Sequence, residues 1–505
     1  MKIFKSFALL SLLILQAYQG FAQQAVKREF RGAWLQTAYQ EQYTRMNRAE
    51  MQSYLIDQLD RLELAGINAI IFQIRPSSDA FYNSKLEPWS RFLTGRQGKG
   101  PVPAWDPTEF IIEECHKRNM EFHAWLNPYR VTTSKNELLT NSHIYHKNPE
   151  WFVEYDGKIY FDPGLPQSRK FIRTVVKDIV QRYDVDAIHM DDYFYPYPVA
   201  GKDFPDDRSF ATYREKMGFT ASQKKDWRRQ NVNILIKSLH DDIRELKPWV
   251  RFGISPFGIY RNKRNDPNGS ETNGLQNYDD LYADVLRWTR EGWVDYMLPQ
   301  LYWEIGHKAA DYATLARWWD QNGNDRHMYI GQSISRSLDE NGNLKNSDNH
   351  FSKKMDMTRR LPNINGNCFW YGYQIANNES GIATVLSKKY HKTPSLIPAY
   401  EFIDNIKPAA IKKLKAKWSP EGYILTWKTR ETDDEMQKQI YFCIYRFENG
   451  EKVNLEDASR IVATTRETSY LLPYDNGKTR YRYVVTAVDR MHNESEKGVS
   501  KKVKL

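Results

Sequence analysis

Short apolar segments alternate with amphipathic helical segments from residue 31 to about residue 386. In the first helical segment, Met51, Leu55, Leu59 and Leu62 recur every three or four positions, so they share one face of a helix. Eight such strand–helix repeats predict an α/β fold, a closed (β/α)8 TIM barrel. The eight predicted strands are RGAWLQT, INAIIFQIRP, MEFHAWLNPYR, VDAIHMDDYF, VRFGISPFGIYR, VDYMLPQLYWE, HMYIGQSI and GNCFWYGYQ.

An open, doubly wound parallel sheet is the main alternative for this alternation. That fold binds dinucleotides through a Gly-x-Gly-x-x-Gly turn after its first strand, and the sequence has no such motif there. A long segment, residues 131–167, follows the third predicted strand and contains a predicted hairpin that turns at Asp156 and Gly157. Long loops after barrel strands usually shape the binding site, so we expect this segment beside it.

The pattern changes after about residue 386. KTPSLIPAYEF is typical of a linker, and period-two strands follow it: GYILTWKT, IYFCIYRF, TSYLLP and YRYVVTAVDRMHNES. They predict a small antiparallel β-sandwich. The last of them, and Trp427 in GYILTW, resemble fibronectin type III domains. The predicted organisation is a signal peptide at 1–22, the barrel at 28–390, a linker at 391–404 and the sandwich at 405–505.

The first residues have the pattern of a secretory signal peptide. Lys2 and Lys5 precede the apolar run FALLSLLIL, and the small residues Gly20 and Ala22 stand before the expected cleavage point. No other segment approaches the ~18 apolar residues of a membrane-spanning helix. We therefore expect an exported protein, periplasmic or secreted, without a transmembrane anchor. Its three cysteines fall in different predicted elements and indicate no disulfide framework.

Composition narrows the classes of partner. The formal charge of +10 is spread along the chain, without the dense basic run of a nucleic-acid-binding arm, so no nucleic-acid partner is expected. The chain has 15 Trp and 32 Tyr. Because sugars present flat C–H faces that stack on aromatic rings, this composition favours a carbohydrate ligand. Large barrels also use aromatic residues in packing, so composition alone does not decide.

In a (β/α)8 barrel, functional side chains project from the carboxyl ends of the strands. Polar and aromatic residues crowd the ends of the first six predicted strands, which a purely structural barrel would not need. The candidate substrate-binding residues are Trp34, Gln73, Arg75, Trp125, Asn127, Tyr129, Arg130, His189, Tyr193, Ser255, Arg261, Gln300, Tyr302 and Trp303.

The stretch IHMDDYFYP holds the principal candidate carboxylates, Asp191 and Asp192. Side chains alternate along a strand, so Asp191 shares a side with His189, while Asp192 begins the loop. Such a pair often only caps a turn, but this one ends a buried strand. Hydrolysis of a glycosidic bond needs two carboxyl groups, one as the acid and one as the nucleophile or base. Asp191 is the candidate nucleophile or base, and Asp192 or Glu304 is the candidate acid.

Other chemistries are less well supported. His143 and His146 lie in a loop without an acidic ligand at metal spacing, and neither a Gly-x-Ser-x-Gly elbow nor a catalytic cysteine context is present. Asp162 and Asp266, on long loops, are alternative acids, although such Asp-Pro pairs usually mark turns. We therefore expect no metal and no cofactor.

Seven ordered motifs over residues 28–390 resemble the glycosyl-hydrolase-like-10 family. They are RGAWLQT, INAIIFQIRP, HAWLNPYR, YFDPGLP, DAIHMDDYFYP, FGISPFGIYR and DYMLPQLYW. The family consists of exported barrel proteins and includes a divisome-associated hydrolase of peptide-free glycan strands, so the resemblance implies a glycoside hydrolase of peptidoglycan glycan. DAIHMD is also similar to the fourth strand of α-amylase- and α-galactosidase-type barrels, whose nucleophilic aspartate would fall on Asp191. Glu304 follows the family's sixth-strand motif rather than belonging to it.

The leading hypothesis is an exported glycoside hydrolase that acts on a bacterial cell-wall glycan without a cofactor. A non-catalytic glycan-binding barrel at the cell envelope is the first alternative, because a fold does not guarantee turnover. A hydrolase of another polysaccharide is the second. The C-terminal domain is a candidate site for cell-envelope partners.

Overall fold

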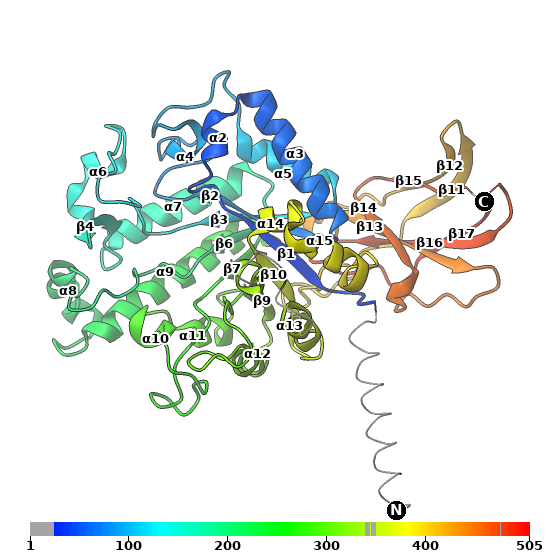
Figure 1. Ribbon diagram of the computed structural model, residues 1–505. Coiled ribbons are helices and arrows are strands. Elements are labelled where there is room, and N and C mark those ends of the chain that lie inside the picture. Colours follow the sequence, from blue (N-terminus) through cyan, green and yellow to red (C-terminus); the bar gives the residue numbers. More distant parts are fainter. Residues whose placement is uncertain (1–24, 339–343, 345–349, 475) are drawn as a thin grey trace, which may run out of the picture.

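The computed structural model describes residues 25–338, 344, 350–474 and 476–505, so the predicted signal peptide lies outside the described residues. Eight parallel strands close into a barrel in the order β1-β10-β9-β8-β7-β6-β3-β2 (Figure 1). This confirms the predicted (β/α)8 barrel and excludes the open sheet. The barrel strands are β1 (Phe30–Leu35), β2 (Ala69–Arg75), β3 (Glu121–Leu126), β6 (Ala187–Met190), β7 (Arg251–Ile254), β8 (Tyr296–Met297), β9 (His327–Ser333) and β10 (Ile364–Trp370).

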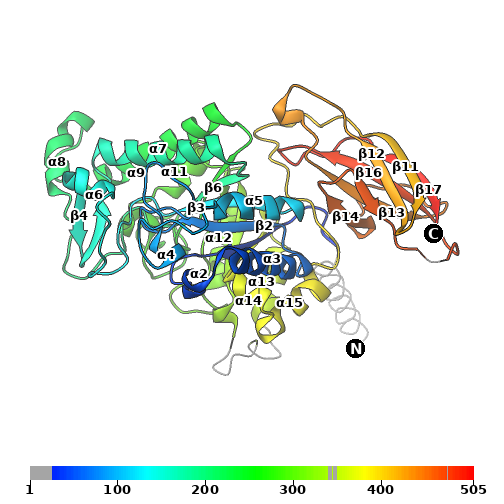
Figure 2. The same ribbon diagram turned by 90° about the horizontal axis from the view of Figure 1, so that it is seen from above.

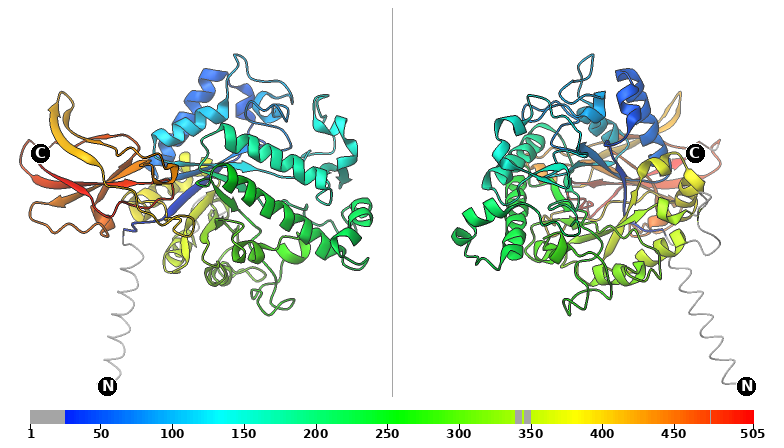
Figure 3. Two further views of the ribbon diagram at one scale, coloured as in Figure 1. Left: turned by 180° about the vertical axis from the view of Figure 1, so that it is seen from behind. Right: turned by 60° about the vertical axis from the view of Figure 1, so that its left-hand side comes forward.

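Helices surround the barrel, as the right-hand view of Figure 3 shows. The first long helix begins with a capping box, in which Asn47 and Glu50 each accept a hydrogen bond from the other's backbone N–H. Its residues Met51, Leu55 and Leu59 are buried, as their spacing predicted. Within the described part of the chain, no helix has the length and apolar character needed to cross a membrane. The α-helices are α2 (Glu41–Arg45), α3 (Arg48–Leu64), α4 (Arg91–Thr94), α5 (Pro107–Lys117), α6 (Ile144–Lys147), α7 (Pro166–Arg182), α8 (Asp207–Tyr213), α9 (Lys224–Leu246), α10 (Asn277–Asp280), α11 (Val285–Arg290), α12 (Tyr312–Gln321), α13 (His350–Thr358), α14 (Gly372–Ala376) and α15 (Ile382–Val385).

The long segment after β3 carries the predicted hairpin, formed by β4 (Phe152–Tyr155) and β5 (Lys158–Phe161). Its turn residues Asp156 and Gly157 have φ values of 50° and 72°, the left-handed conformation that tight hairpin turns require. The hairpin, α6 and α8 lie at the end of the barrel away from the C-terminal domain (Figures 1 and 2). These insertions therefore extend the carboxyl end of the barrel.

A column of hydrogen-bonded polar side chains runs through the barrel interior. The Tyr296 hydroxyl lies 2.9 Å from His189 Nδ1 and 2.8 Å from His123 Nδ1, and His123 Nε2 lies 2.9 Å from Glu121 Oε2. A Cβ at Gly253 would lie 1.9 Å from the Tyr296 ring, so glycine makes room for it. Burial lowers the pKa of His123 to about 4 and that of His189 well below its usual range, so both rings are neutral near pH 7. The column joins the two ends of the barrel.

The C-terminal domain consists of two antiparallel sheets, as predicted. The predicted core residue Trp427 is buried, and its ring lies 5.2 Å from that of Phe442. The four predicted strands correspond to β12, β13, β15 and β16. Sequence analysis missed β11, β14 and β17; β11 and β17 carry several exposed lysines. The sheets are β11 (Lys412–Ser419), β12 (Gly422–Lys428) and β15 (Ser469–Leu471), and β14 (Ile461–Thr465), β13 (Tyr441–Glu448), β16 (Arg480–Val488) and β17 (Val499–Lys504).

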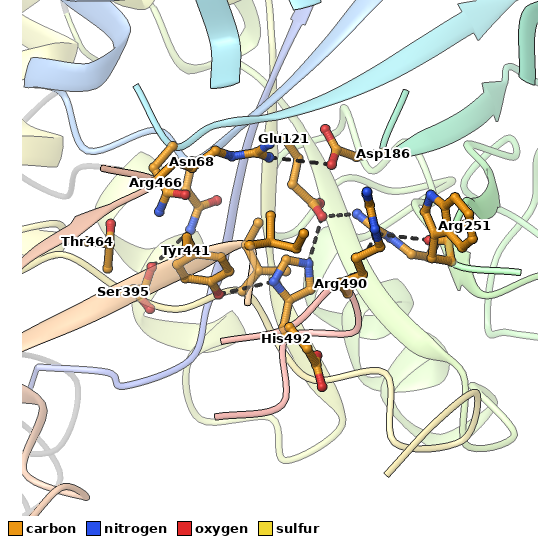
Figure 4. A pocket seen from close by; sticks show the side chains of 15 residues that line it. Asn68, Glu121, Asp186, Arg251, Ser395, Tyr441, Thr464, Arg466, Arg490 and His492 are labelled. Carbon is orange, nitrogen blue, oxygen red and sulfur yellow. Dashed lines mark hydrogen bonds and ion pairs between the residues drawn. The ribbon is translucent and has the colours of Figure 1, made fainter. Parts of the chain in front are cut away.

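This domain closes the amino end of the barrel (Figure 4). His492 Nε2 lies 2.7 Å from Glu121 Oε1, and the same carboxylate forms an ion pair with Arg251. Across the interface, Arg466 lies 3.6 Å from Asp186. One cavity of about 30 Å³, enough for a water molecule, lies between the domains. The amino end is therefore a sealed, charge-paired interface.

Candidate active site

A cavity of about 580 Å³ opens at the carboxyl end of the barrel. Its walls come from the ends of the strands and the loops that follow them, the place where barrel enzymes carry their chemistry. Ten of the predicted site residues line it: Trp34, Gln73, Trp125, Arg130, Asp191, Asp192, Tyr193, Ser255, Gln300 and Tyr302. The other lining residues are Gln36, Ala38, Tyr39, Tyr197, Trp370 and Tyr371.

Asp191 is buried and accepts several hydrogen bonds from neutral donors. Trp125 Nε1 donates at 3.1 Å to Oδ2, and Asn127 Nδ2 lies 3.2 Å from Oδ1 and 3.3 Å from Oδ2. The backbone N–H of Tyr193 donates to Oδ1 at 3.3 Å. Burial raises the pKa of Asp191, while Arg130 and these donors act in the opposite direction. The donors thus stabilise the charged form of a carboxylate that burial disfavours.

Asp192 has fewer donors and an unfavourable neighbour. The Tyr197 hydroxyl donates to Oδ2 at 2.5 Å, and Gln300 Nε2 donates to Oδ1 at 3.2 Å. Burial and the adjacent charge of Asp191 raise the pKa of Asp192 to about 7. The two adjacent carboxyl groups thus differ: Asp191 has more donors to its charged form than Asp192, whose pKa lies near neutral pH.

The register of the strands explains this arrangement. In the parallel pairing of β3 with β6, Trp125 lies beside His189 and Leu126 beside Met190. The chain beyond both strands then brings Asn127 next to Asp191. The Asn127 side chain is itself held in place, because its Oδ1 accepts the backbone N–H of Arg130 at 2.9 Å.

Aromatic rings form much of the cavity wall. The Trp370 ring stands edge-on to those of Trp34, at 6.2 Å, and Trp125, at 5.9 Å. On another part of the wall, the Arg130 guanidinium lies 5.5 Å from the Tyr193 ring centroid. This guanidinium donates to the carbonyl of Pro76. The cavity thus combines flat apolar surfaces with one cation, a composition that suits sugar rings bearing an acidic group.

Three predicted site residues are buried and do not line the cavity. Asn127 is fully buried and holds Asp191. His189 is also buried, 3.0 Å from the Ser255 hydroxyl, and accepts the Trp34 indole N–H at 3.4 Å. Tyr129 is buried in the outer core of the barrel. The first two can position cavity residues without touching a substrate.

The remaining predicted residues do not line the cavity. Arg75 is buried in a bidentate ion pair with Glu87. Arg261 pairs with two loop carboxylates, Asp266 and Asp279. The Trp303 ring packs 5.3 Å from that of Phe257, and Glu304 follows it outside the cavity lining.

Two of the unpredicted residues in the cavity wall could have been predicted from the sequence. Trp370 is the last residue of β10 and Tyr371 follows it, so the strand-end criterion applied to the eighth strand, with its end at Trp370, identifies them. Ala38 and Tyr39 lie in the loop after β1, where no residue pattern distinguishes them. Among the described residues, no group of three or more His, Cys, Asp or Glu side chains is placed to hold a metal ion.

A sequence model of the family described as Glycosyl hydrolase-like 10 matches residues 29–351, more than half of the chain. The chain belongs to the glycosyl hydrolase-like 10 family. This glycosyl hydrolase-like 10 chain is 39% identical over 478 residues to Glycosyl hydrolase YngK of Bacillus subtilis (strain 168), covering 93% of the chain and 92% of YngK. It is 36% identical over 332 residues to Glycosyl hydrolase DigH of Escherichia coli (strain K12), covering 62% of the chain and 74% of DigH.

Among solved structures, the chain is similar to the PgaB (BpsB) glycoside hydrolase domain from Bordetella bronchiseptica. The TM-score is 0.48 and the identity 12%, over 72% of the chain and 99% of that domain. The family and the two relatives confirm the predicted activity class of this glycosyl hydrolase-like 10 protein: it is a glycoside hydrolase.

Proposed function

We propose that this glycoside hydrolase is exported and cleaves glycosidic bonds within the glycan strands of bacterial peptidoglycan. The observation that carries the proposal is the pair of buried acids at the cavity surface, which differ in their partners. Asp191 accepts from Trp125 and Asn127, whereas Asp192 has Asp191 as a like-charged neighbour. Such a difference separates an anion from a proton donor within one site.

In the proposed reaction, Asp192 is the general acid and Asp191 the nucleophile or general base. Asp192 gives its proton to the glycosidic oxygen while the bond from that oxygen to the anomeric carbon breaks. Asp191 either attacks the anomeric carbon or removes a proton from the attacking water. Gln300 and Tyr197 hold the Asp192 carboxyl group in place through their hydrogen bonds.

The cavity wall supports an acidic sugar as the substrate. Trp34, Trp125 and Trp370 offer faces and edges for sugar rings. Arg130 lines the same cavity and bonds a neutral carbonyl, so its charge is available for a carboxylate on the substrate. Peptidoglycan glycan carries such a carboxylate on its muramic acid residues once the peptide is removed. The signal-peptide pattern of residues 1–22 supports export to the same compartment.

The test is product release from purified, peptide-free glycan strands by the parent enzyme and by Asp191→Asn. The proposal expects new reducing ends with the parent and a loss of at least about a hundredfold in Asp191→Asn. Asn127→Ala, which removes a donor to Asp191, should lose less. If the parent binds the strands and releases nothing, the chain is a glycan-binding barrel. If it cleaves only neutral polysaccharides, the proposed substrate is wrong.

A further inference from the structure

The C-terminal domain exposes a group of aromatic rings at the tip of the β11–β12 hairpin. Trp418 is 58% exposed and Tyr474 is 50% exposed. All 15 tryptophans lie within the described residues, and Trp418 is the only exposed one. Burial of a tryptophan is strongly favourable. A tryptophan that stays exposed to water on a folded domain, next to other exposed rings, therefore indicates an interaction surface.

These rings contact one another and form what we call the tip cluster: Trp418, Tyr423 and Tyr474. Trp418 and Tyr423 are direct partners across the two strands, with ring centroids 5.0 Å apart. The Tyr474 ring lies 4.9 Å from that of Trp418. Along β11, Leu414 and Ala416 pack on the sandwich core, and Trp418 continues the same face beyond it. The cluster is thus a fixed apolar platform.

Lysines lie next to this platform on the edge strand, where Lys415 and Lys417 project from the face of β11 opposite to Trp418. β11 exposes Lys412, Lys413, Lys415 and Lys417 directly before Trp418. The neighbouring strand β17 exposes Lys501, Lys502 and Lys504. None of these lysines forms an ion pair with a described residue. Residues 405–505 hold 20 Lys and Arg against 14 Asp and Glu, a formal charge of +6.

Protection of a sheet edge explains only part of this surface. Exposed lysines on an edge strand such as β11 prevent pairing with other chains. An exposed tryptophan and an exposed tyrosine next to these lysines do not help to prevent such pairing. Flat rings next to uncompensated cations instead match a polymer that presents both sugar faces and negative charge.

We propose that the tip cluster binds an anionic glycan strand, with sugar rings stacked on Trp418 and Tyr474 and strand carboxylates beside the β11 lysines. The hairpin lies on the side of the sandwich away from the barrel, and the catalytic cavity opens at the opposite end of the barrel (Figures 1 and 2). The cluster therefore holds the enzyme on its polymer and does not extend the catalytic cleft. This binding is separate from turnover, although the choice of polymer rests on the proposed function.

The experiment uses the full chain carrying Asp191→Asn, so that the probe is not consumed, and immobilised peptide-free peptidoglycan glycan strands. In this background, Trp418→Ala with Tyr474→Ala should weaken binding about tenfold or more. Lys415→Gln with Lys417→Gln should weaken it less, and the loss should shrink at high salt. Ile406→Ala, an equally exposed apolar site in the same domain, is the matched control and should leave binding unchanged.

Two further measurements separate the possible outcomes. With Asp191 intact, the double aromatic variant should hydrolyse short soluble glycan fragments at the parent rate. Strands whose carboxylates have been reduced should bind the parent about as weakly as the lysine variant binds intact strands. Unchanged affinity of the aromatic variant for the strands overturns the proposal. A changed sedimentation coefficient with unchanged glycan affinity would identify the cluster as a contact between copies of the chain.

Discussion

Both ends of the barrel bury acidic residues, but the partners of these residues differ between the two ends. At the amino end, Glu121 meets Arg251 and His492, and Glu29 meets both Arg31 and Arg359. Burial alone would raise the pKa of Glu29, but the two guanidinium groups lower it to about 2. At the carboxyl end, the two acids of the cavity, Asp191 and Asp192, accept hydrogen bonds only from neutral donors.

The difference lies in the partners and not in the burial. Asp191 and Asp192 are as buried as Glu29, yet their pKa values are raised. Acids paired with cations contribute to stability at neutral pH, whereas unpaired acids held next to each other cost stability and gain reactivity. The barrel thus separates a structural end, sealed by the C-terminal domain, from a reactive end that is left open.

The largest expected effect is on turnover at the open end. Asp192→Asn removes the proposed proton donor and keeps its shape, so kcat on peptide-free strands should fall about 10²- to 10⁴-fold. Arg75→Lys disturbs a buried ion pair at the same end that does not line the cavity, and serves as the comparison. Parent-level turnover by Asp192→Asn would show that another residue is the general acid.

At the sealed end, the expected effect is on stability. Glu121→Ala leaves the Arg251 guanidinium buried without its carboxylate and should lower the free energy of unfolding by about 3–5 kcal/mol. Turnover per folded molecule should stay near that of the parent. Denaturant unfolding measures the first quantity, and activity normalised to the folded fraction measures the second. A stable but inactive Glu121→Ala protein would mean that the two ends are not independent.

The pH dependence of stability sharpens the contrast. Because the folded-state pKa of Asp192 is raised to about 7, the folded protein holds a proton that the unfolded chain loses near its ordinary value of about 4. Stability should therefore fall as pH rises from 4 to 7. Asp192→Asn removes this contribution. Between pH 5 and 7, the free energy of unfolding of the variant should therefore increase relative to that of the parent by on the order of 1 kcal/mol per pH unit. A constant difference across this range would contradict the raised pKa.

The smallest expected effect concerns a single hydrogen bond. The Tyr197 hydroxyl stabilises the charged form of Asp192, so Tyr197→Phe should raise the pKa of that carboxyl further. The alkaline limb of the pH–rate profile should then move upward by about half a pH unit. Tyr39→Phe alters another cavity tyrosine, for which no bond to either acid is seen, and should leave the limb in place. A downward shift in Tyr197→Phe would reverse the assigned role of this bond.

The fold was predictable because its pattern is regular. Most barrel strands contain apolar runs that end near polar residues, and the C-terminal strand β13 contains the buried apolar run YFCIY. β17 was missed because Val499 and Val503 are its only apolar residues, and β11 was missed although Leu414, Ala416 and Trp418 alternate with lysines in it. Their exposure at the outer side of the sandwich explains why such residues are tolerated.

The site was predictable where the backbone alone places a side chain. Asp191, Trp125 and Gln300 follow from the rule that barrel sites form at the carboxyl ends of strands. Arg75 and Arg261 satisfy the same rule, but carboxylates from the segments that follow their own strands neutralise them. Their pairing depends on how these segments fold back onto the strand ends, which the strand pattern does not contain.

The most direct test of the account is the pH dependence of kcat/KM on peptide-free glycan strands, for the parent and Asp192→Asn. The account predicts that the parent rate falls as pH rises through about 7, when Asp192 loses its proton. The residual activity of Asp192→Asn should show no such fall. A parent rate that stays level to pH 9, or the same fall in Asp192→Asn, would contradict Asp192 as the acid of this site.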